Sequence, residues 1–398
     1  MTKTLAIHGA KPVRKEYLIF GSPDIGKAEI EEVVDSLKSG WLGTGPKVKK
    51  FEEDFSKFVQ TKYAKALNSC TAGLHLAQIA AGVGRGDEVI TTPLTFASTA
   101  NVILHVGAKP IFVDVDIQTG NIDVEKIEKK ITKKTKAIIP VHLHGRPVEM
   151  NPVLKTARKH KLTIIEDAAH AAGASYKGKK IGSIGDMTAF SFYVTKNIVT
   201  GEGGMVTTNN KKFADLIELY ALHGMTKGAW QRYSDSGFKH YLIQVPGYKY
   251  NMMDIQASIG IHQLKKFNKG QIVRRRIWNQ YNRAFADLPV TLPAQVPKHM
   301  THAYHLYTIL LNLDKLKTTR DMIQQALHKE NIGSGIHFIS LHLHPFYKHL
   351  FNFKSGDFPN AEFISNRTIS LPLSSKLTQK DVDDVIRATK KVINYFTL

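Results

Sequence analysis

Between about residues 60 and 210 the sequence alternates short apolar runs with amphipathic stretches of helical length. The apolar runs, which we predict to be strands, lie at 63–67, 88–91, 110–113, 137–141, 162–165, 187–192 and 204–208. The predicted helices lie at 72–81, 97–106, 123–132 and 153–160. Nearly unbroken apolar strands must be covered on both faces, which is typical of parallel sheets whose crossovers are helices. The alternation therefore predicts an α/β fold with a mainly parallel sheet.

The pattern changes after a long helical stretch that runs from about residue 253 to 285. Beyond it we predict a strand at 304–311, a helix at 319–329, a strand at 335–338 and a closing helix at 379–395. These elements suit a smaller α/β domain that the N-terminal segment joins. The expected organisation is a large domain over residues 45–265 and a small domain built from residues 1–44 and 266–398.

Composition excludes several classes of site and location. Cys70 is the only cysteine in 398 residues, so the chain can form neither an intrachain disulfide nor a thiolate zinc cluster. No apolar run reaches the roughly 18 residues that a membrane helix needs, and the first residues lack the apolar stretch of a secretory signal. We therefore expect a soluble, cytoplasmic protein that makes no membrane contact.

The charge is strongly basic, because 55 Lys and Arg residues against 34 Asp and Glu residues give a net charge of +21. Such an excess attracts anions of many kinds, from nucleic acids to phosphorylated metabolites. The densest basic run, at 126–136, carries Ile127 and Ile131 at helical spacing, which indicates a solvated helix face rather than a nucleic-acid patch. We expect no nucleic-acid partner.

A small polar segment at 68–75 separates a predicted strand from a predicted helix. Ligands of open parallel sheets gather beyond the carboxyl ends of the strands. Free backbone amides and hydroxyls at a helix N-terminus suit a phosphate group. Simple capping of the helix by Ser69 or Thr71 explains the same residues. Both interpretations stay open for this segment alone.

Two ionisable residues follow other strands. Asp167 ends the strand that we expect to be central, where a poorly hydrated carboxylate needs a cationic partner or a capping role. Lys196 lies between an apolar strand and the glycine-rich turn at 201–204, where loss of water would lower its pKa and make the amine nucleophilic. A phosphate cradle, a buried aspartate and a desolvated lysine together are what pyridoxal 5′-phosphate requires.

The order of these segments along the chain is that of a known family. The motifs are GWLGTGP at 40–46, NSCTAGLHL at 68–76, PLTFAST at 93–99, EDAAH at 166–170, SFYVTKN at 191–197, GEGG at 201–204, GYKYNMMD at 247–254, HFISLH at 337–342 and SLPL at 370–373. With them the whole chain resembles the sugar aminotransferases of the DegT/DnrJ/EryC1/StrS group. The resemblance implies fold type I of the pyridoxal-phosphate enzymes, the aspartate-aminotransferase-like fold.

The resemblance also implies roles for individual residues. Lys196 would form the Schiff base with the cofactor and carry the proton of the 1,3-shift. Asp167 would pair with the pyridinium nitrogen, and His170 would lie beside the phenolic oxygen. The remaining cofactor contacts would come from Phe96 on the ring and from Thr71, Ala72 and Ser191 on the phosphate.

A further phosphate contact is implied from a second subunit. In the family, the loop that matches residues 247–251 reaches across a homodimer to the neighbouring phosphate. The common form is Gly-x-Asn-x-Arg, whereas this chain has Lys249 and Asn251 at the Asn and Arg positions. Which of the two would touch the phosphate stays open. The alternative is that Lys249 is solvated and Asn251 caps the following helix.

The sugar end of the site is implied at two places. In the family, the turn that matches Gly43 and Thr44 and the region that matches His337 and His342 line the substrate; a structural role is equally open for each. The spacings His142-x-His144 and His342-x-His344 would place each pair on one face of an extended segment, but two histidines without carboxylates are a poor ligand set, so we expect no metal.

The expected activity follows from the retained lysine, because dehydratase relatives carry histidine at the position of Lys196. We expect an aminotransferase of amino-sugar biosynthesis, as in lipopolysaccharide, O-antigen or antibiotic sugars. Its substrate would be a nucleotide-linked keto-sugar, with amination at C4 and L-glutamate as donor. Within the family, a 3-keto-sugar or a keto-cyclitol is the alternative, since residues 5–14 resemble some cyclitol enzymes. A nucleic-acid-binding or regulatory protein on a vestigial enzyme fold would rest on the charge alone.

Overall fold

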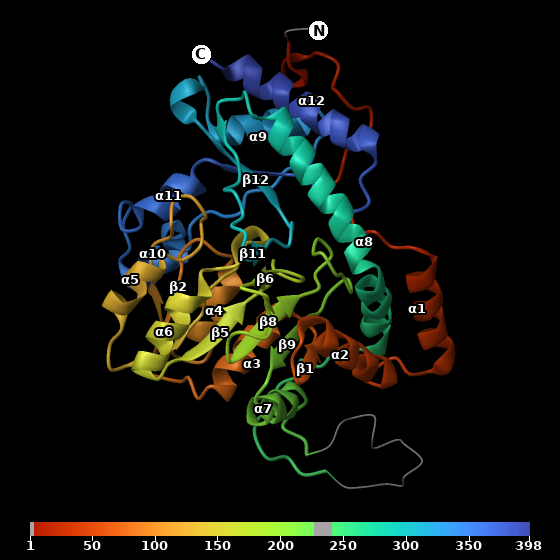
Figure 1. Cartoon of the computed structure of the whole chain (residues 1–398), viewed down its shortest axis with the longest axis vertical. Coiled ribbons are helices and arrows are strands. Elements are labelled where there is room, and N and C mark those ends of the chain that lie inside the picture. The colour runs from red at the N-terminus through yellow and green to blue at the C-terminus, as the bar shows by residue number, and fades with distance from the viewer. Residues whose placement is uncertain (1–3, 227–240) are drawn as a thin grey trace.

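The computed structural model describes residues 4–226 and 241–398 (Figure 1). A seven-stranded sheet forms the centre of the larger part. Its strands follow the spatial order β1 (Tyr63–Leu67), β9 (Gly204–Thr208), β8 (Met187–Ser191), β5 (Thr163–Asp167), β4 (Thr135–Ile138), β2 (Glu88–Thr91) and β3 (Lys109–Phe112). Only β9 is antiparallel to its neighbours. The mainly parallel α/β sheet is thus confirmed, with β5 in its middle as predicted.

Alternate side chains of the strands point to opposite faces of this sheet, and both faces are buried. In β5, Ile164 joins one hydrophobic core and Ile165 joins the other. The first core is covered by α2 (Pro46–Val59), α5 (Val124–Ile127), α6 (Met150–His160) and the first half of α8 (Asp254–Ala284). The second is covered by α3 (Cys70–Ala80), α4 (Ala97–His105) and α7 (Lys211–Ala221). This double cover explains why the strands are apolar on both sides.

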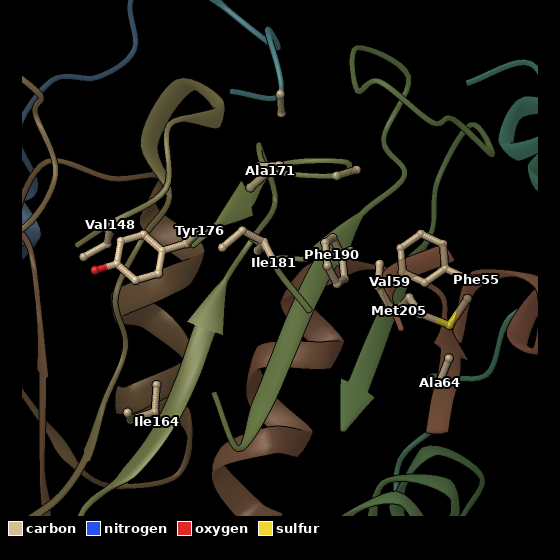
Figure 2. Close-up of a cluster of buried hydrophobic side chains, with 14 of the residues drawn as sticks. Phe55, Val59, Ala64, Val148, Ile164, Ala171, Tyr176, Ile181, Phe190 and Met205 are labelled. Atoms are coloured by element: carbon tan, nitrogen blue, oxygen red, sulfur yellow. The ribbon is translucent and has the colours of Figure 1, made fainter. Parts of the chain in front are cut away.

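Aromatic rings fill the first core where α2 crosses the sheet. Helix α2 starts at Pro46, whose fixed φ suits a first helical position, and its buried residues include Phe51 and Phe55 at helical spacing. Phe55 meets Phe190 of β8 edge-on, with ring centroids 5.0 Å apart; both are labelled in Figure 2. The packing fixes β8, and with it the turn that carries Lys196.

The long helix α8 leads from this body into a second one (Figure 1). Its second half buries Ile277, Trp278 and Tyr281 in a separate core. That core also contains residues of β12 (Tyr307–Leu311), β13 (Thr368–Leu371), α9 (Arg320–Lys329) and α12 (Gln379–Phe396), with β10 (Val290–Thr291) beside β12. A small three-stranded sheet of β6 (Ser175–Tyr176), β7 (Lys179–Lys180) and β11 (Met300–Thr301) links the two parts of the chain.

Two predicted segments cross the expected domain limits. Helix α1 (Lys27–Ser39) packs on the first half of α8, where His262 lies 2.9 Å from a carboxylate oxygen of Glu32. Helices α10 (Pro345–Phe351) and α11 (Pro359–Ser365) share a core with Leu94 and Phe112 of the large domain. Phe267, Met300 and Ala303 also belong to the first core, so the chain beyond residue 265 packs against both bodies, and the division at residues 45 and 265 stays a prediction.

Two predicted elements are wrong in part. The expected helix at 123–132 is a single turn, α5, followed by a 3-10 turn (Glu128–Lys130), because Ile131 is already extended and Thr132 Oγ1 donates to Glu88 at 2.5 Å. The expected strand at 335–338 is only an isolated bridge between Gly335 and Ser370. It cannot extend as a ladder because the carbonyl of His337 accepts from the ring of His144 instead.

No helix among residues 4–226 and 241–398 is long and apolar enough to cross a membrane.

Candidate active site

The candidate residues meet at one edge of the large sheet. Strands β1, β2, β5 and β8 run in the same direction, so their carboxyl ends share this edge. Asp167 ends β5, and the turn that carries Lys196 follows β8. The structure therefore brings together the three segments that the sequence singled out.

Lys196 lies in a turn that packing holds rigidly. Its backbone amide donates to the Tyr193 carbonyl at 2.9 Å. The N-terminal segment crosses the same turn so closely that a Cβ on Gly21 would be 2.6 Å from Thr195 Cγ2. Burial lowers the pKa of the Lys196 amine to about 8, although the charge of Asp167 opposes the shift. The side chain is only partly exposed, and its amine is easily deprotonated, as a nucleophile needs.

Asp167 is buried at the end of the central strand. One carboxylate oxygen accepts from Thr99 Oγ1 at 2.8 Å and the other from the Ala169 amide at 3.1 Å. Burial nevertheless raises the pKa of the carboxyl, because these bonds and the nearby Lys196 do not offset the loss of water. Across the described part of the chain no basic side chain forms a salt bridge with it. A pyridinium nitrogen would supply the missing cation.

His170 is buried beside Lys196, and its proton can be placed. The backbone amide of His144 donates to His170 Nδ1 at 3.2 Å. This nitrogen is therefore an acceptor, and the neutral ring carries its proton on Nε2. Burial and the nearby Lys196 hold the pKa of the ring well below its usual value. His170 thus presents an N–H donor, which fits the phenolic oxygen of the expected cofactor.

The phosphate end begins at the first turn of α3. Ser69 caps the helix, because its hydroxyl accepts from the Ala72 amide at 3.0 Å. The capping interpretation is therefore correct for Ser69, while the neighbouring Thr71 is exposed on the first turn. A Cβ on Gly204 would lie 2.3 Å from the carbonyl carbon of Ser69, so only glycine lets the two segments approach this closely.

Two further cofactor candidates line the same edge. Ser191 is buried at the end of β8, and its hydroxyl accepts from the Tyr193 amide at 3.3 Å. Phe96 precedes α4 and is 60% exposed, an unusual position for so large an apolar ring. Its ring centroid lies 6.0 Å from that of Phe338. The open ring face suits stacking on a planar cofactor.

The loop at 247–251 is placed differently from the buried residues. Lys249 is exposed, and Asn251 Nδ2 donates to Thr44 Oγ1 at 2.7 Å. Thr44 in turn donates to the Met252 carbonyl at 2.6 Å. Helix α8 begins after Met253, so the alternative in which Asn251 caps this helix is wrong. The loop and the turn of Gly43 and Thr44 therefore form one unit.

The two histidines expected at the sugar end lie in different environments. His337 is partly exposed; its Nδ1 lies 2.8 Å from Ser370 Oγ, and its ring stacks on Phe20 at 5.6 Å. His342 is fully buried, with Ser340 Oγ on one ring nitrogen at 2.8 Å and Glu362 on the other at 2.9 Å. Since both nitrogens of His342 have partners and no surface remains, we withdraw it as a substrate residue.

The pair His142 and His144 does not share a face. His144 has a φ of 58°, so the segment turns instead of extending. His142 lies 2.9 Å from Glu166, and both side chains are fully buried. Its other nitrogen accepts from the Val148 amide at 3.0 Å. Within the described residues there is no group of three His, Cys, Asp or Glu side chains that could hold a metal ion.

Several residues of the site were not predicted from the sequence. Thr99 holds Asp167, Phe20 covers His337, and Asn197 and His305 contact each other across 3.3 Å. Thr99 lies in a motif already noted at 93–99. Phe20 and His305 carry no local signal, because their contacts depend on how the two bodies pack.

Comparisons with known proteins agree with this geometry. The model of the DegT/DnrJ/EryC1/StrS aminotransferase family matches residues 23–390. The spore coat polysaccharide biosynthesis protein SpsC of Bacillus subtilis is 49% identical over 381 residues, which cover 96% of this chain and 98% of SpsC. The PLP form of the candidate sugar aminotransferase Spr1654 from Streptococcus pneumoniae has a TM-score of 0.87 at 35% identity, covering 95% of this chain and 99% of that one.

A third relative was solved with a ligand. DesI, in the presence of its TDP-sugar product, has a TM-score of 0.87 at 28% identity. The match covers 99% of this chain and 98% of DesI. Spr1654 is also known in a PMP form, with a TM-score of 0.88 at 36% identity.

Proposed function

Because this chain belongs to the DegT/DnrJ/EryC1/StrS aminotransferase family, we propose that it aminates a nucleotide-linked keto-sugar at C4, with L-glutamate as the amino donor. The family and its solved members make it a pyridoxal-phosphate-dependent sugar aminotransferase. The observation that carries the proposal is that the Lys196 turn after β8 and the buried Asp167 at the end of β5 meet at one edge of the sheet, where burial lowers the pKa of the lysine amine. An intact lysine favours amino transfer over dehydration.

Each residue of the site would have a different role in the reaction. Bound pyridoxal phosphate supplies an electron sink for the bond that breaks at the amino-bearing carbon. Asp167 would hold the proton of the pyridinium nitrogen, which would keep the ring electron-poor. Lys196 would hold the cofactor through its amine and would carry the proton between the two reacting carbons. His170 would donate from Nε2 to the phenolic oxygen, and Phe96 would stack on the ring.

Two observations support a nucleotide-linked substrate, and a third supports a sugar. The net charge of +21 favours approach of a diphosphate. The structural relative DesI was solved with a TDP-sugar. His337, with its Nδ1 engaged by Ser370, keeps its other ring nitrogen for a sugar hydroxyl near Phe20. Gly43 and Thr44 would contribute from the turn that Asn251 holds.

The active unit in this proposal is a homodimer. Lys249 is exposed although it lies in the motif loop, and Asn251 is only partly buried. A cavity of about 970 Å³ that Thr44 and Asn251 help to line runs between α2, β1 and α7, so this face is not closed by the chain's own residues. A second subunit would cover it and receive Lys249 or Asn251 at its phosphate. The phosphate would then be held by Thr71, Ala72 and Ser191 of one chain and by this loop of the other.

The substrate can be identified by running one half of the reaction. We would convert the enzyme to its pyridoxamine form with glutamate and measure 2-oxoglutarate. The enzyme would then be incubated with a panel of nucleotide-linked 4-keto- and 3-keto-sugars and a keto-cyclitol, and the return of the pyridoxal absorbance would be recorded. Rapid return with 4-keto-sugars is expected. Return only with a 3-keto-sugar or the cyclitol would replace the proposed substrate, and a lack of 2-oxoglutarate would refute glutamate as donor.

A further inference from the structure

His305 contacts both the turn that carries Lys196 and the ring of His170. It precedes β12 and is 3% exposed. Its Nδ1 is 3.3 Å from the Oδ1 of Asn197, the residue next to Lys196. Its ring centroid is 4.7 Å from that of His170, at an angle of 44°. One side chain thus touches both the lysine turn and the histidine expected at the phenolic oxygen.

The hydrogen bonds fix which atoms donate. Asn197 Nδ2 donates to the Ala303 carbonyl at 2.6 Å, which directs Oδ1 toward His305. An amide oxygen can only accept, so the ring of His305 carries its proton on Nδ1 and donates to Asn197. His305 is then neutral, with Nε2 as its free acceptor. This tautomer is the opposite of that of His170, whose Nδ1 accepts.

Hydrogen bonds from helix α8 hold the backbone of the segment that carries His305. Arg274 of α8 is buried and donates Nη1 to the carbonyls of Leu373 at 2.8 Å and His305 at 3.4 Å. Burial lowers the pKa of this guanidinium to about 10. Hydrogen bonds from a charged guanidinium to carbonyls are strong, so they hold the backbone of this segment in place. The helix that joins the two bodies therefore sets the position of His305.

The charges around His305 agree with a neutral ring. The titratable groups that face it are Lys196, His170, Arg274 and His337, and none of them is acidic. Burial and these groups hold the pKa of His305 well below its usual value.

From this geometry we propose that His305 is a positioning residue that couples the Lys196 turn to His170, so that the amine and the phenolic-oxygen donor keep a fixed separation. The inference rests on the proposed function. The hydrogen bond to Asn197 sets the lysine turn, and ring contact sets the orientation of His170. In this proposal His305 acts through Asn197 and His170.

Two variants separate the two contacts. His305→Phe keeps a flat ring against His170 but removes the donor to Asn197. His305→Asn places an amide N–H near the former Nδ1 position but removes the ring. The matched control is His160→Phe, because His160 lies at the end of α6 and, among the described residues, its ring bonds Glu128 alone.

The readouts are cofactor affinity, the midpoint pH of the visible absorbance of the bound cofactor, and the melting temperature without cofactor. His305→Phe should weaken cofactor binding roughly two- to tenfold, the worth of one buried hydrogen bond, and shift the midpoint. His305→Asn should bind cofactor more tightly than His305→Phe, because it restores a donor to Asn197, but it should still shift the midpoint, because the ring contact with His170 is lost. In a double-mutant cycle, His305→Phe and Asn197→Ala should be non-additive in cofactor affinity, whereas His160→Phe should be additive with either.

The outcomes are distinct. If wild-type protein binds no cofactor, the proposed function fails. If wild-type protein binds it but His305→Phe and Asn197→Ala change neither affinity nor midpoint, or act additively, the coupling role is wrong while the function stands. Should His305→Phe not fold, as judged by its melting curve, Asn197→Ala tests the same contact from the other side, and unchanged affinity would overturn the proposal.

Discussion

Lys196, Asp167 and His170 lie at a largely buried end of the candidate site, whereas Thr71 at the phosphate end and Lys249 in the 247–251 loop are exposed. Loss of water shifts the pKa values of Lys196 and His170 at the first end. The contrast suggests a division: the chain builds the chemical end alone and leaves the phosphate end to be completed on binding or by a second subunit. Variants at the two ends should therefore differ in kind.

The largest effect on turnover is expected at the buried end of the site, where Lys196 lies. Lys196→Ala should lower turnover by about a thousandfold or more, because it removes both the nucleophile and the proton carrier. The protein should still fold and still bind cofactor through the phosphate end. Turnover and cofactor binding would be measured together, and substantial amino transfer by the variant would contradict the assignment.

Asp167→Asn should come next, with turnover about a hundredfold lower. The amide can no longer hold a proton on the pyridine nitrogen. Stability without cofactor should be unchanged or higher, because a neutral amide avoids the burial that raises the pKa of the carboxyl. Comparing turnover with the melting temperature of the cofactor-free protein separates a chemical role from a structural one. A fall in both by similar measure would indicate that Asp167 only supports the fold.

At the open end, Lys249→Ala and Asn251→Ala should act on affinity instead. Loss of a charge-assisted phosphate contact should weaken cofactor binding about ten- to a hundredfold for one of the two, with turnover retained at saturating cofactor. The mass of the native species would be determined alongside. A fully active monomer, or affinity unchanged in both variants, would end the idea of a shared phosphate site.

The rate of cofactor uptake should depend on pH through the buried Lys196 amine. Below the pKa of about 8 the Lys196 amine is protonated and cannot attack a carbonyl, while above it the neutral amine can. The rate of cofactor uptake by the cofactor-free protein should therefore rise with pH through a midpoint near 8. Since the charge of Asp167 raises that pKa, Asp167→Asn should move the midpoint lower. A midpoint near the ordinary lysine value of 10.5 would show that the amine is not desolvated.

The smallest effect on catalysis is expected at His342, which touches neither end. His342→Ala should reduce the free energy of unfolding by about 1–3 kcal/mol, because Ser340 and Glu362 lose a buried partner. The Michaelis constant for the sugar should stay within twofold of wild type. A large rise in this Michaelis constant at normal stability would show that His342 does belong to the substrate site.

The chemical end could be predicted from sequence because its parts follow strands. Apolar runs mark β5 and β8, and the carboxyl ends of parallel strands meet at one edge, which places Asp167 and Lys196 together. The direction of β9 could not be predicted, since an apolar run has the same pattern in either direction. Helix α2 was overlooked, although Pro46 and the buried spacing of Phe51 and Phe55 are local signals.

Other features depend on packing between distant segments. The turn at His144 has a positive φ that the regular His-x-His spacing conceals. His305 reaches Asn197 only because Arg274 and α8 hold the second body against the sheet edge. The sequence pattern shows which residues follow strands. It does not show which side chains from distant segments pack against those residues.

The central claim is that Lys196 is the residue that bonds the cofactor. We would load the protein with pyridoxal phosphate, reduce it with borohydride, digest it and map the modified peptide by mass spectrometry. We expect a single pyridoxyl group on Lys196, and none on that peptide in Lys196→Ala. Labelling of a different lysine, or no stable label in the wild-type protein, would contradict it.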